Sequence, residues 1–348
     1  SFLLFRRLPA QSIILQSSEW RKATKKALPR LAPYTKISSM SAELEPRGMS
    51  SFLDNKDQKE DTPSIWYGHS LLTASLFPAE QPSEDTPAIT KLNGNIEYIL
   101  EASYDPITGK RLYPSGKYPR LIMVWMAKQI RRAGKRKTST CDPERHIITL
   151  PSVGALCDEL GLGHGGKTAQ RVQEQFRLLL RSRISLRKVM GFKGSDYHDI
   201  IDIPIAKETV FKESETSAEF SGLSVMLTEE VWNKLATESA PFNMSAAKKL
   251  LSGRSVMPWD IYLWLVGSLP KIKRPMPITW QWLYERFGTG SQLKNFKEQF
   301  KRSLSKALEA YPEANVELTS KGIVLSPSSP VIGRNPPQKR ISVRKYYR

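Results

Sequence analysis

Two stretches with the same apolar pattern decide the predicted fold. Residues 167–182 read KTAQRVQEQFRLLLRS, and residues 291–310 read SQLKNFKEQFKRSLSKALEA. In both, apolar side chains recur at the three- and four-residue spacing of one face of an α-helix. They are Val172, Phe176, Leu179 and Leu180 in the first stretch and Leu293, Phe296, Phe300, Leu304 and Ala307 in the second. Each stretch is therefore predicted to be an amphipathic helix with one buried side.

The elements around each long helix are predicted to follow one order: a helix, a short strand, a short helix closed by glycine, the long helix, and a hairpin. In the first copy the surrounding elements are expected at residues 119–132, 148–150, 152–160, 184–190 and 199–205. In the second copy they are expected at residues 258–269, 278–280, 280–287, 316–318 and 323–325. Trp125 corresponds to Trp264 in this repeat, and Phe176 to Phe300. Because three helices followed by a hairpin is the order of a winged helix, we expect an α+β, helix-rich fold of two tandem winged-helix domains.

The domain boundaries follow from the composition on either side of the repeat. We expect a largely disordered N-terminal segment at 1–70, a first winged-helix domain at 71–212, a second at 213–328, and a basic disordered tail at 329–348. Between residues 41 and 85 Ser, Pro, Asp and Glu are frequent, which favours a solvated linker. Phe77-Pro78 and a strand or hairpin at Leu92–Leu100 are expected to open the folded part.

The first residues are basic and contain no acidic residue before Glu19. This pattern superficially resembles a mitochondrial transit peptide. We favour an unusual start codon or an upstream extension, with Met40 or Met49 as alternative starts. The sequence leaves open whether residues 1–48 belong to the native product.

The charge of the chain indicates a polyanionic partner. The 348 residues carry 53 Lys and Arg against 34 Asp and Glu, a formal net charge of +19. Hydrophobic residues make up 40% of the chain, enough for folded cores, yet no apolar run approaches the roughly 20 residues that span a bilayer. Two cysteines exclude a disulfide framework and fit a reducing compartment such as the cytoplasm. Nucleic acid is the polyanion we expect, and no membrane.

A glycine-rich stretch between the short and long helices of the first copy has the spacing of a phosphate-binding loop. Residues 161–168 read GLGHGGKT and fit G-x-x-x-x-G-K-[ST]. A nucleotide-binding loop follows a buried strand, whereas residues 153–160 have helical periodicity and contain Asp158 and Glu159. We interpret the glycines as a tight helix-turn-helix turn that needs positive φ, and expect no bound cofactor.

The outer faces of the two long helices carry the candidate DNA-binding residues. Arg can pair with guanine, Gln with adenine and Glu with cytosine, while outer Lys and Arg hold phosphates. Any exposed helix face is charged, but residues 120–188 contain fifteen Lys or Arg against five acids. The DNA-binding candidates are Lys167, Gln170, Arg171, Glu174, Arg177 and Arg181 in the first helix and Lys294, Asn295, Lys301 and Arg302 in the second.

Other residues give weaker signals. The basic run at 135–137 either grips a phosphate or is simply solvated. The tail at 339–348 would add affinity that does not depend on DNA sequence. Trp66, Trp232, Trp259, Trp280 and Trp282 are expected to be core or interface aromatics rather than base-stacking platforms.

Catalytic and metal sites are not indicated. Cys141, His146, Cys157 and His164 have none of the tight pairs typical of zinc sites. No hydrolase or metalloprotease motif occurs, and clustered acidic or histidine ligands for metal-dependent strand cleavage are missing from the sequence pattern. We therefore expect no catalytic residue, no metal and no enzymatic activity.

Several motifs together resemble the RepA-type replication initiators encoded by bacterial plasmids. The resemblance covers roughly residues 75–330, and the chain departs from it at Lys167-Thr168, where the family commonly has a bulky residue after Gly-Gly. The motifs are Asn93-Gly94-Asn95, Tyr118 to Trp125, Gly165-Gly166 with Arg171, Gln175, Phe176 and Leu179, Trp259 to Leu265, Leu269-Pro270, Arg286-Phe287-Gly288, Phe296, Phe300-Lys301 and Tyr311 to Ala314.

This resemblance implies a protein that binds repeated sites (iterons) in double-stranded plasmid origin DNA and helps to open the adjacent A·T-rich duplex. It also implies recruitment of the host initiator and replicative helicase, repression of the initiator's own gene with control of copy number, and a monomer–dimer equilibrium. Two alternatives remain open at this point. They are a transcriptional repressor with tandem winged helices and a P-loop NTPase that acts on nucleic acid.

Overall fold

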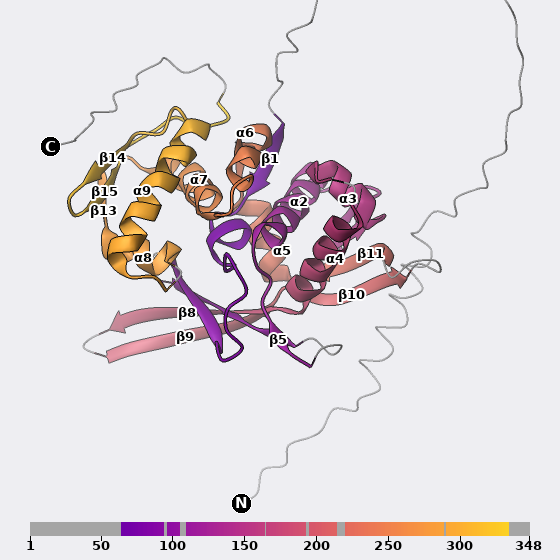
Figure 1. The fold of residues 1–348 in the computed structure, drawn as a ribbon. Coiled ribbons are helices and arrows are strands. Elements are labelled where there is room, and N and C mark those ends of the chain that lie inside the picture. Colours follow the sequence, from indigo (N-terminus) through magenta and orange to yellow (C-terminus); the bar gives the residue numbers. More distant parts are fainter. Residues whose placement is uncertain are drawn as a thin grey trace, which may run out of the picture. The chain divides into compact units, whose positions relative to one another are not determined.

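The computed structural model describes residues 64–93, 96–104, 109–163, 165–192, 195–213, 220–288 and 290–333 (Figure 1). They belong to one compact unit, residues 62–348. The segment expected to be disordered before residue 64 and the basic tail from residue 334 lie outside the described residues. Within the described part, no helix has the length and apolar character needed to cross a membrane.

The fold is a mixture of helices and small antiparallel sheets, as the sequence predicts. The helical elements are η1 (Leu71–Ser75), α2 (Lys117–Ala133), α3 (Val153–Leu160), α4 (Gly166–Arg181), α5 (Glu229–Thr237), α6 (Met244–Lys248), η2 (Lys249–Leu251), α7 (Met257–Ser268), η3 (Leu269–Lys271), α8 (Trp280–Phe287) and α9 (Leu293–Ala310). The strands are β1 (Ile65–Gly68), β2 (Ala88–Asn93), β3 (Ile96–Glu101), β4 (Ser103–Tyr104), β5 (Arg111–Leu112), β6 (Cys141–Asp142), β7 (Ile147–Leu150), β8 (Arg183–Phe192), β9 (Ser195–Pro204), β10 (Ala206–Glu213), β11 (Phe220–Leu227), β12 (Ala240–Asn243), β13 (Met276–Thr279), β14 (Val316–Thr319) and β15 (Gly322–Leu325).

The helices expected in both copies of the repeat are present, and the short helix of each copy has a side-chain cap at its start. Ser152 begins α3 by accepting a 3.0 Å hydrogen bond from the Ala155 amide, and Gly161 ends it in the left-handed region at φ 57°. Thr279 begins α8 in the same way, accepting from the amide of Trp282 at 3.2 Å. We call α2, α3 and α4 the first helical unit, and α7, α8 and α9 the second.

The second helical unit carries the expected hairpin. Strands β14 and β15 pair with each other, β13 pairs with the far side of β15, and the order is β13-β15-β14. Ile323 of β15 lies opposite Ile278 on one side and Leu318 on the other. The strand that precedes α8 thus closes a sheet with the hairpin that follows α9.

In the first helical unit the expected hairpin forms, but it does not pair with β7, the strand that precedes α3. Strands β8 and β9 are antiparallel with Ile184 opposite Ile203, and β8 pairs with β3, which places Leu100 opposite Ile184. The partner of β7 is instead β11, in a sheet of order β10-β11-β7-β6. The predicted hairpin at residues 184–205 is therefore confirmed, but its sheet is completed by β3 and β2 and not by β7. Alternation specifies the two faces of a strand and not its neighbour.

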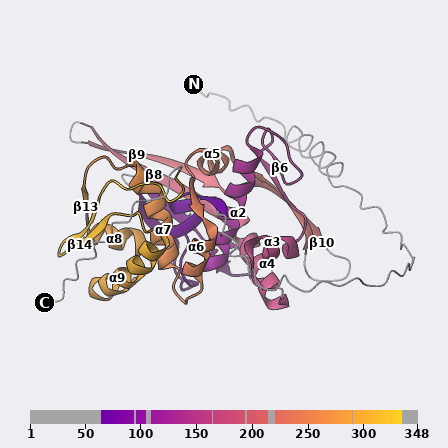
Figure 2. The same ribbon diagram turned by 90° about the horizontal axis from the view of Figure 1, so that it is seen from above.

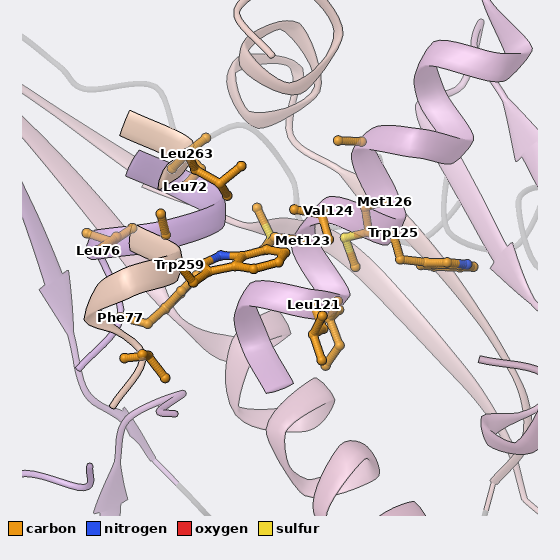
Figure 3. Packing of buried hydrophobic residues seen from close by; sticks show 14 of the residues in the cluster. Leu72, Leu76, Phe77, Leu121, Met123, Val124, Trp125, Met126, Trp259 and Leu263 are labelled. Carbon is orange, nitrogen blue, oxygen red and sulfur yellow. The ribbon is translucent and has the colours of Figure 1, made fainter. Parts of the chain in front are cut away.

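Helix α7 lies at the centre of the core and is buried on every side. Trp259, Ile261, Tyr262, Leu263 and Leu265 each expose 0% of their surface. The helix contacts α9, η1, η3 and β12. Figure 3 shows the side chain of Trp259 projecting toward Met123 of α2, and its indole nitrogen donates to the Thr73 carbonyl at 3.0 Å. A helix that is apolar on nearly every side has no solvent face, so α9, η1, η3 and β12 enclose α7 in the core.

The expected linker at residues 41–85 is wrong for its last part. Trp66, Leu72 and Phe77 are buried, and β1 pairs with β12 with Trp66 opposite Phe242. The polar composition of the stretch conceals these apolar side chains, which are separated by serine, threonine and glycine. Trp232, Trp259 and Trp280 are also buried, as expected for core aromatics, and Trp282 is half-buried.

Candidate nucleic-acid interface

Helix α4 separates an apolar inner stripe from a charged outer face. Val172 and Phe176 are fully buried, and Phe176 meets Trp125 of α2 edge to face at 6.5 Å between ring centroids. The side chains of Lys167, Gln170, Arg171, Glu174 and Arg181 are exposed. Packing of the stripe therefore fixes which predicted residues face solvent.

Arg177 differs from the other candidates on α4. Its side chain is half-buried, and its guanidinium lies 5.8 Å from the ring centroid of Phe211 on β10. A cation over an aromatic face is attracted to the ring and loses some freedom. Arg177 is thus partly held by the adjacent sheet, whereas Arg171 is free of such a contact among the interactions described.

Helix α9 has the same division between its two sides. Phe296, Phe300 and Ala307 are fully buried. The four candidates on the outer face, Lys294, Asn295, Lys301 and Arg302, are all exposed.

Lys301 is the candidate on α9 with an ion-pair partner. Its Nζ lies 2.8 Å from Oε1 of Glu298, one turn away on the same helix. The hydrogen bond from Lys301 lowers the pKa of Glu298. Exposed pairs of this kind contribute little to stability, so Lys301 can exchange this partner for a phosphate at small cost.

Helices α4 and α9 lie on one side of the described structure. Helices α4 and α9 are both toward the viewer in Figure 1 and along the lower edge of Figure 2. Strand β6, which follows the basic run at residues 135–137, lies at the upper edge of Figure 2. All three residues of this run are exposed, and Lys137 Nζ bonds the Asp142 carboxylate at 2.6 Å. The structure does not bring this run together with the two helices.

The glycine-rich stretch forms the connection between α3 and α4. Gly161 alone among its described glycines has positive φ, whereas Gly165 is extended at φ −69°. The expectation that the glycines as a group need positive φ was therefore wrong. Positive φ is needed at Gly161, where α3 ends, and the other described glycines before α4 have negative φ or extended backbone that other residues can adopt. The element before the loop is a helix, so the buried strand that precedes a nucleotide-binding loop is replaced by α3.

The residues weighed as zinc ligands do not form a site among the described residues. No group of three or more potential ligands comes together there, and His164 lies outside them. Cys141 and Cys157 are buried thiols. Burial raises the pKa of Cys141 to about 12, which disfavours the thiolate that a metal would need.

A set of buried charges between the two helical units was missed by the sequence analysis. Arg120 of α2 forms a two-pronged ion pair with Asp260 of α7, with distances of 2.7 Å from Nε to Oδ1 and 2.8 Å from Nη2 to Oδ2. Lys91 of β2 donates to the Gly288 carbonyl at 2.8 Å, and Arg286 of α8 donates to the Ser70 carbonyl at 3.1 Å. A single charge within an apolar helix is the signal that could have found this pair, since Arg120 precedes LIMVW and Asp260 precedes IYLWL.

Fold and surface together define a mixed α+β protein with two amphipathic helices, α4 and α9, whose outer faces carry exposed Lys and Arg side chains. Residues 113–282 match the model of a family described as "Plasmid encoded RepA protein". The match confirms, over these residues, the resemblance seen in the sequence motifs.

Two crystal structures of domains 2 and 3 of RctB are also similar. One, of a selenomethionine derivative, has 8% sequence identity and a TM-score of 0.47 over 74% of this chain and 97% of that chain. The other has 8% identity and a TM-score of 0.40 over 72% of this chain and 92% of that chain. No curated protein sequence matches the chain.

Proposed function

We propose that this protein is a plasmid replication initiator that binds double-stranded origin DNA through the outer faces of α4 and α9. The match of residues 113–282 to the model of the plasmid-encoded RepA family supports the role in replication initiation. The observation that carries the DNA-binding proposal is a pair of amphipathic helices that lie on one side of the structure, each with a buried apolar stripe and exposed Lys and Arg side chains.

Both helical units are proposed to be winged-helix domains. In the second, the chain order is α7, β13, α8, α9, β14 and β15, and β15 pairs with β13. The first has the order α2, β7, α3, α4, β10 and β11 once the β8–β9 hairpin is set aside, and β11 pairs with β7. The shared order supports α4 and α9 as recognition helices. Strand β11 pairs with β7 of the first helical unit. We therefore move the proposed division between the domains from residue 212 to residue 227.

The proposed contacts follow the chemistry of the exposed side chains. Arg171 can bond guanine in a two-pronged manner, Gln170 can do so with adenine, and Glu174 can accept from cytosine. Lys167, Lys294, Lys301 and Arg302 would hold phosphates, which adds affinity at every sequence. Two helices on one side of one chain can enter successive major grooves, which lie about 34 Å apart along the duplex.

The biological steps that the family resemblance implies are part of the proposal. Binding to iterons would concentrate bending and untwisting strain in flexible A·T-rich steps beside them. Recruitment of the host initiator and helicase, repression of the initiator's own gene, and a change between dimer and monomer would follow. No catalytic residue, metal or cofactor is assigned to these steps.

The test is binding of duplexes selected by the protein from a random-sequence pool, followed by alanine variants. Arg171→Ala is expected to weaken binding of the selected duplex by about 1–3 kcal/mol and to relax the base preference at one position. Lys294→Ala is expected to weaken selected and random duplexes alike and to reduce the salt slope by about one. Lys135→Ala is the matched control, because it removes an exposed positive charge in the connection between α2 and β6, outside both proposed recognition helices.

Two results would contradict the proposal. The first is a wild-type protein that selects no sequence and binds all duplexes equally. The second is a Lys135→Ala variant that loses as much affinity as Lys294→Ala, since binding would then reflect net charge and not the helices.

A further inference from the structure

The contact between the two helical units contains a buried ion pair, Arg120 with Asp260, and Arg120 makes further hydrogen bonds to backbone carbonyls. Arg120 exposes 1% and Asp260 exposes 6% of their surfaces. The Arg120 guanidinium also donates to the carbonyls of Phe77, Pro78 and Gly116, at 2.7, 3.4 and 2.6 Å. The N–H groups of Arg120 thus bond partners from the start of α2, from α7 and from the segment after η1. Because the guanidinium is planar and rigid, it can make all of these hydrogen bonds in one orientation only.

A second tether joins the units at another point. Lys91 of β2 reaches the Gly288 carbonyl at the end of α8, and β2 belongs to the sheet of order β2-β3-β8-β9. This sheet includes β8, the strand that follows α4 directly. Arg286 of α8 is fully buried and donates to the Ser70 carbonyl beside η1. These two hydrogen bonds, one from Lys91 and one from Arg286, join α8 to the segments that precede the first helical unit.

These buried charges favour one geometry more than they favour stability. Three cations, Lys91, Arg120 and Arg286, are attracted to one carboxylate, that of Asp260. Arg120 bonds this carboxylate directly, and Lys91 and Arg286 interact with it electrostatically. A buried ion pair gains little over apolar side chains of the same volume, because removing the charges from water costs as much as their attraction returns. Apolar surfaces can slide past one another, whereas directed charge-assisted bonds at two separate points cannot do so without breaking.

We propose that Arg120, Asp260 and Lys91 are positioning residues that fix the separation and the relative rotation of α4 and α9. The protein would then accept duplex sites with a single spacing between the two half-sites. The inference rests on the proposed function, because it assumes that both helices bind the same duplex. It assigns the choice of spacing to residues that do not touch DNA.

The periodicity of DNA makes the consequence measurable. One helical turn contains about 10 base pairs, so insertion of five base pairs turns the second half-site to the opposite side of the duplex. A protein whose two helices are held at a fixed rotation cannot bind both halves of such a site. A protein whose units can rotate against each other keeps both contacts over a range of spacings.

The experiment measures binding to duplexes selected from a random-sequence pool by the wild-type protein, with two to five base pairs inserted between the halves. For the wild type we expect a loss of about tenfold or more at five inserted base pairs, comparable to losing a specific contact. Asp260→Asn removes the charge that orients Arg120 and keeps the side-chain volume. Lys91→Met removes the second tether without leaving a buried carboxylate unpaired. Both variants are expected to lose less than about threefold at the same spacing.

Lys128→Met is the matched control, since its ion pair with Glu159 at 2.8 Å joins α2 to α3 within the first helical unit. It is expected to keep the steep dependence on spacing. A second measurement needs no DNA: pulsed electron paramagnetic resonance between spin labels at Lys167→Cys and Ser305→Cys. The distance distribution is expected to be narrow in the otherwise wild-type chain and broader in Asp260→Asn and Lys91→Met.

The outcomes separate this inference from the proposed function. Folded Asp260→Asn and Lys91→Met variants that keep the wild-type dependence on spacing and a narrow label distance would overturn the inference alone. A wild-type protein with no sequence preference for any duplex would contradict the proposed function instead, and the label distances would still report on the tethers.

Discussion

Lys91 makes the stability of this protein depend on pH in the alkaline range. Its ammonium group is buried, and burial lowers the pKa of Lys91 from 10.5 to about 8. Asp260 opposes this shift, while Arg120 and Arg286 add to it. In the unfolded chain Lys91 keeps its proton up to its ordinary pKa, so the unfolded state binds more protons than the folded state between the two values. Stability therefore rises as the pH increases through this window.

The magnitude follows from the difference between the two pKa values. From 10.5 to about 8 is a difference of about 2.5, and each pKa unit corresponds to about 1.4 kcal/mol of differential free energy. The free energy of unfolding should thus gain up to about 3 kcal/mol across the window, with a slope near 1 kcal/mol per pH unit between about pH 8 and 10. Above this range the burial of Arg286, whose pKa is lowered to about 10, and of tyrosines with raised pKa values adds further changes.

Urea unfolding followed by tryptophan fluorescence at several pH values measures this slope. Lys91→Met leaves the Gly288 carbonyl without its donor but also removes the cost of burying a cation, and its free energy of unfolding should be flat between about pH 8 and 10. Lys128→Met should keep the wild-type slope. An equal slope in wild type and Lys91→Met would refute the argument, and so would stability that falls with pH in the wild type.

Three further predictions concern the core, the acid range and a turn. Phe300→Ala should lower the free energy of unfolding by about 3–5 kcal/mol in urea titrations, because the ring is fully buried in the core of the second helical unit. The hydrogen bond from His69 holds the pKa of Glu238 at about 2, so the stability from this carboxylate is present above pH 4.5 and lost as the pH falls toward about 2. Glu238→Gln, at a half-exposed position, should cost about 1 kcal/mol at neutral pH and almost nothing near pH 2 in the same titrations. A methyl group at Gly322 (φ 157°) would lie 1.9 Å from the carbonyl oxygen of Ile278, so Gly322→Ala should lower the melting temperature measured by circular dichroism by several degrees, at a cost of about 2 kcal/mol or more. A Gly322→Ala variant as stable as wild type would show that β13 can shift away from β15.

The sequence predicted the helices better than their surroundings. The stripes of α4 and α9 and the glycine that ends α3 are local signals, because spacing and capping depend on neighbouring residues. Pairing of β11 with β7 brings together residues about 75 positions apart, as between Ser224 and Thr149. No local pattern specifies such a partner. The same limit explains why the hairpin at residues 184–205 was predicted correctly and its neighbour was not.

The candidate site divides in the same way. Which side chains of α4 and α9 face solvent could be predicted, since the buried stripe determines the opposite face. The partial burial of Arg177 against Phe211 could not, because it depends on β10, an element that the sequence analysis did not identify. The ion pair between Arg120 and Asp260 joins residues 140 positions apart in the chain. A single charge within each apolar helix could have drawn attention to these two residues, but no local pattern shows that they meet.

The central position of α7 has a consequence for engineering. Its residues are enclosed on all sides, so a substitution on any face of this helix disturbs packing somewhere. The outer faces of α4 and α9 carry almost none of that packing. A library that randomises only exposed positions such as Gln170, Glu174 and Asn295 could therefore yield proteins directed to new target sequences while the scaffold keeps its melting behaviour.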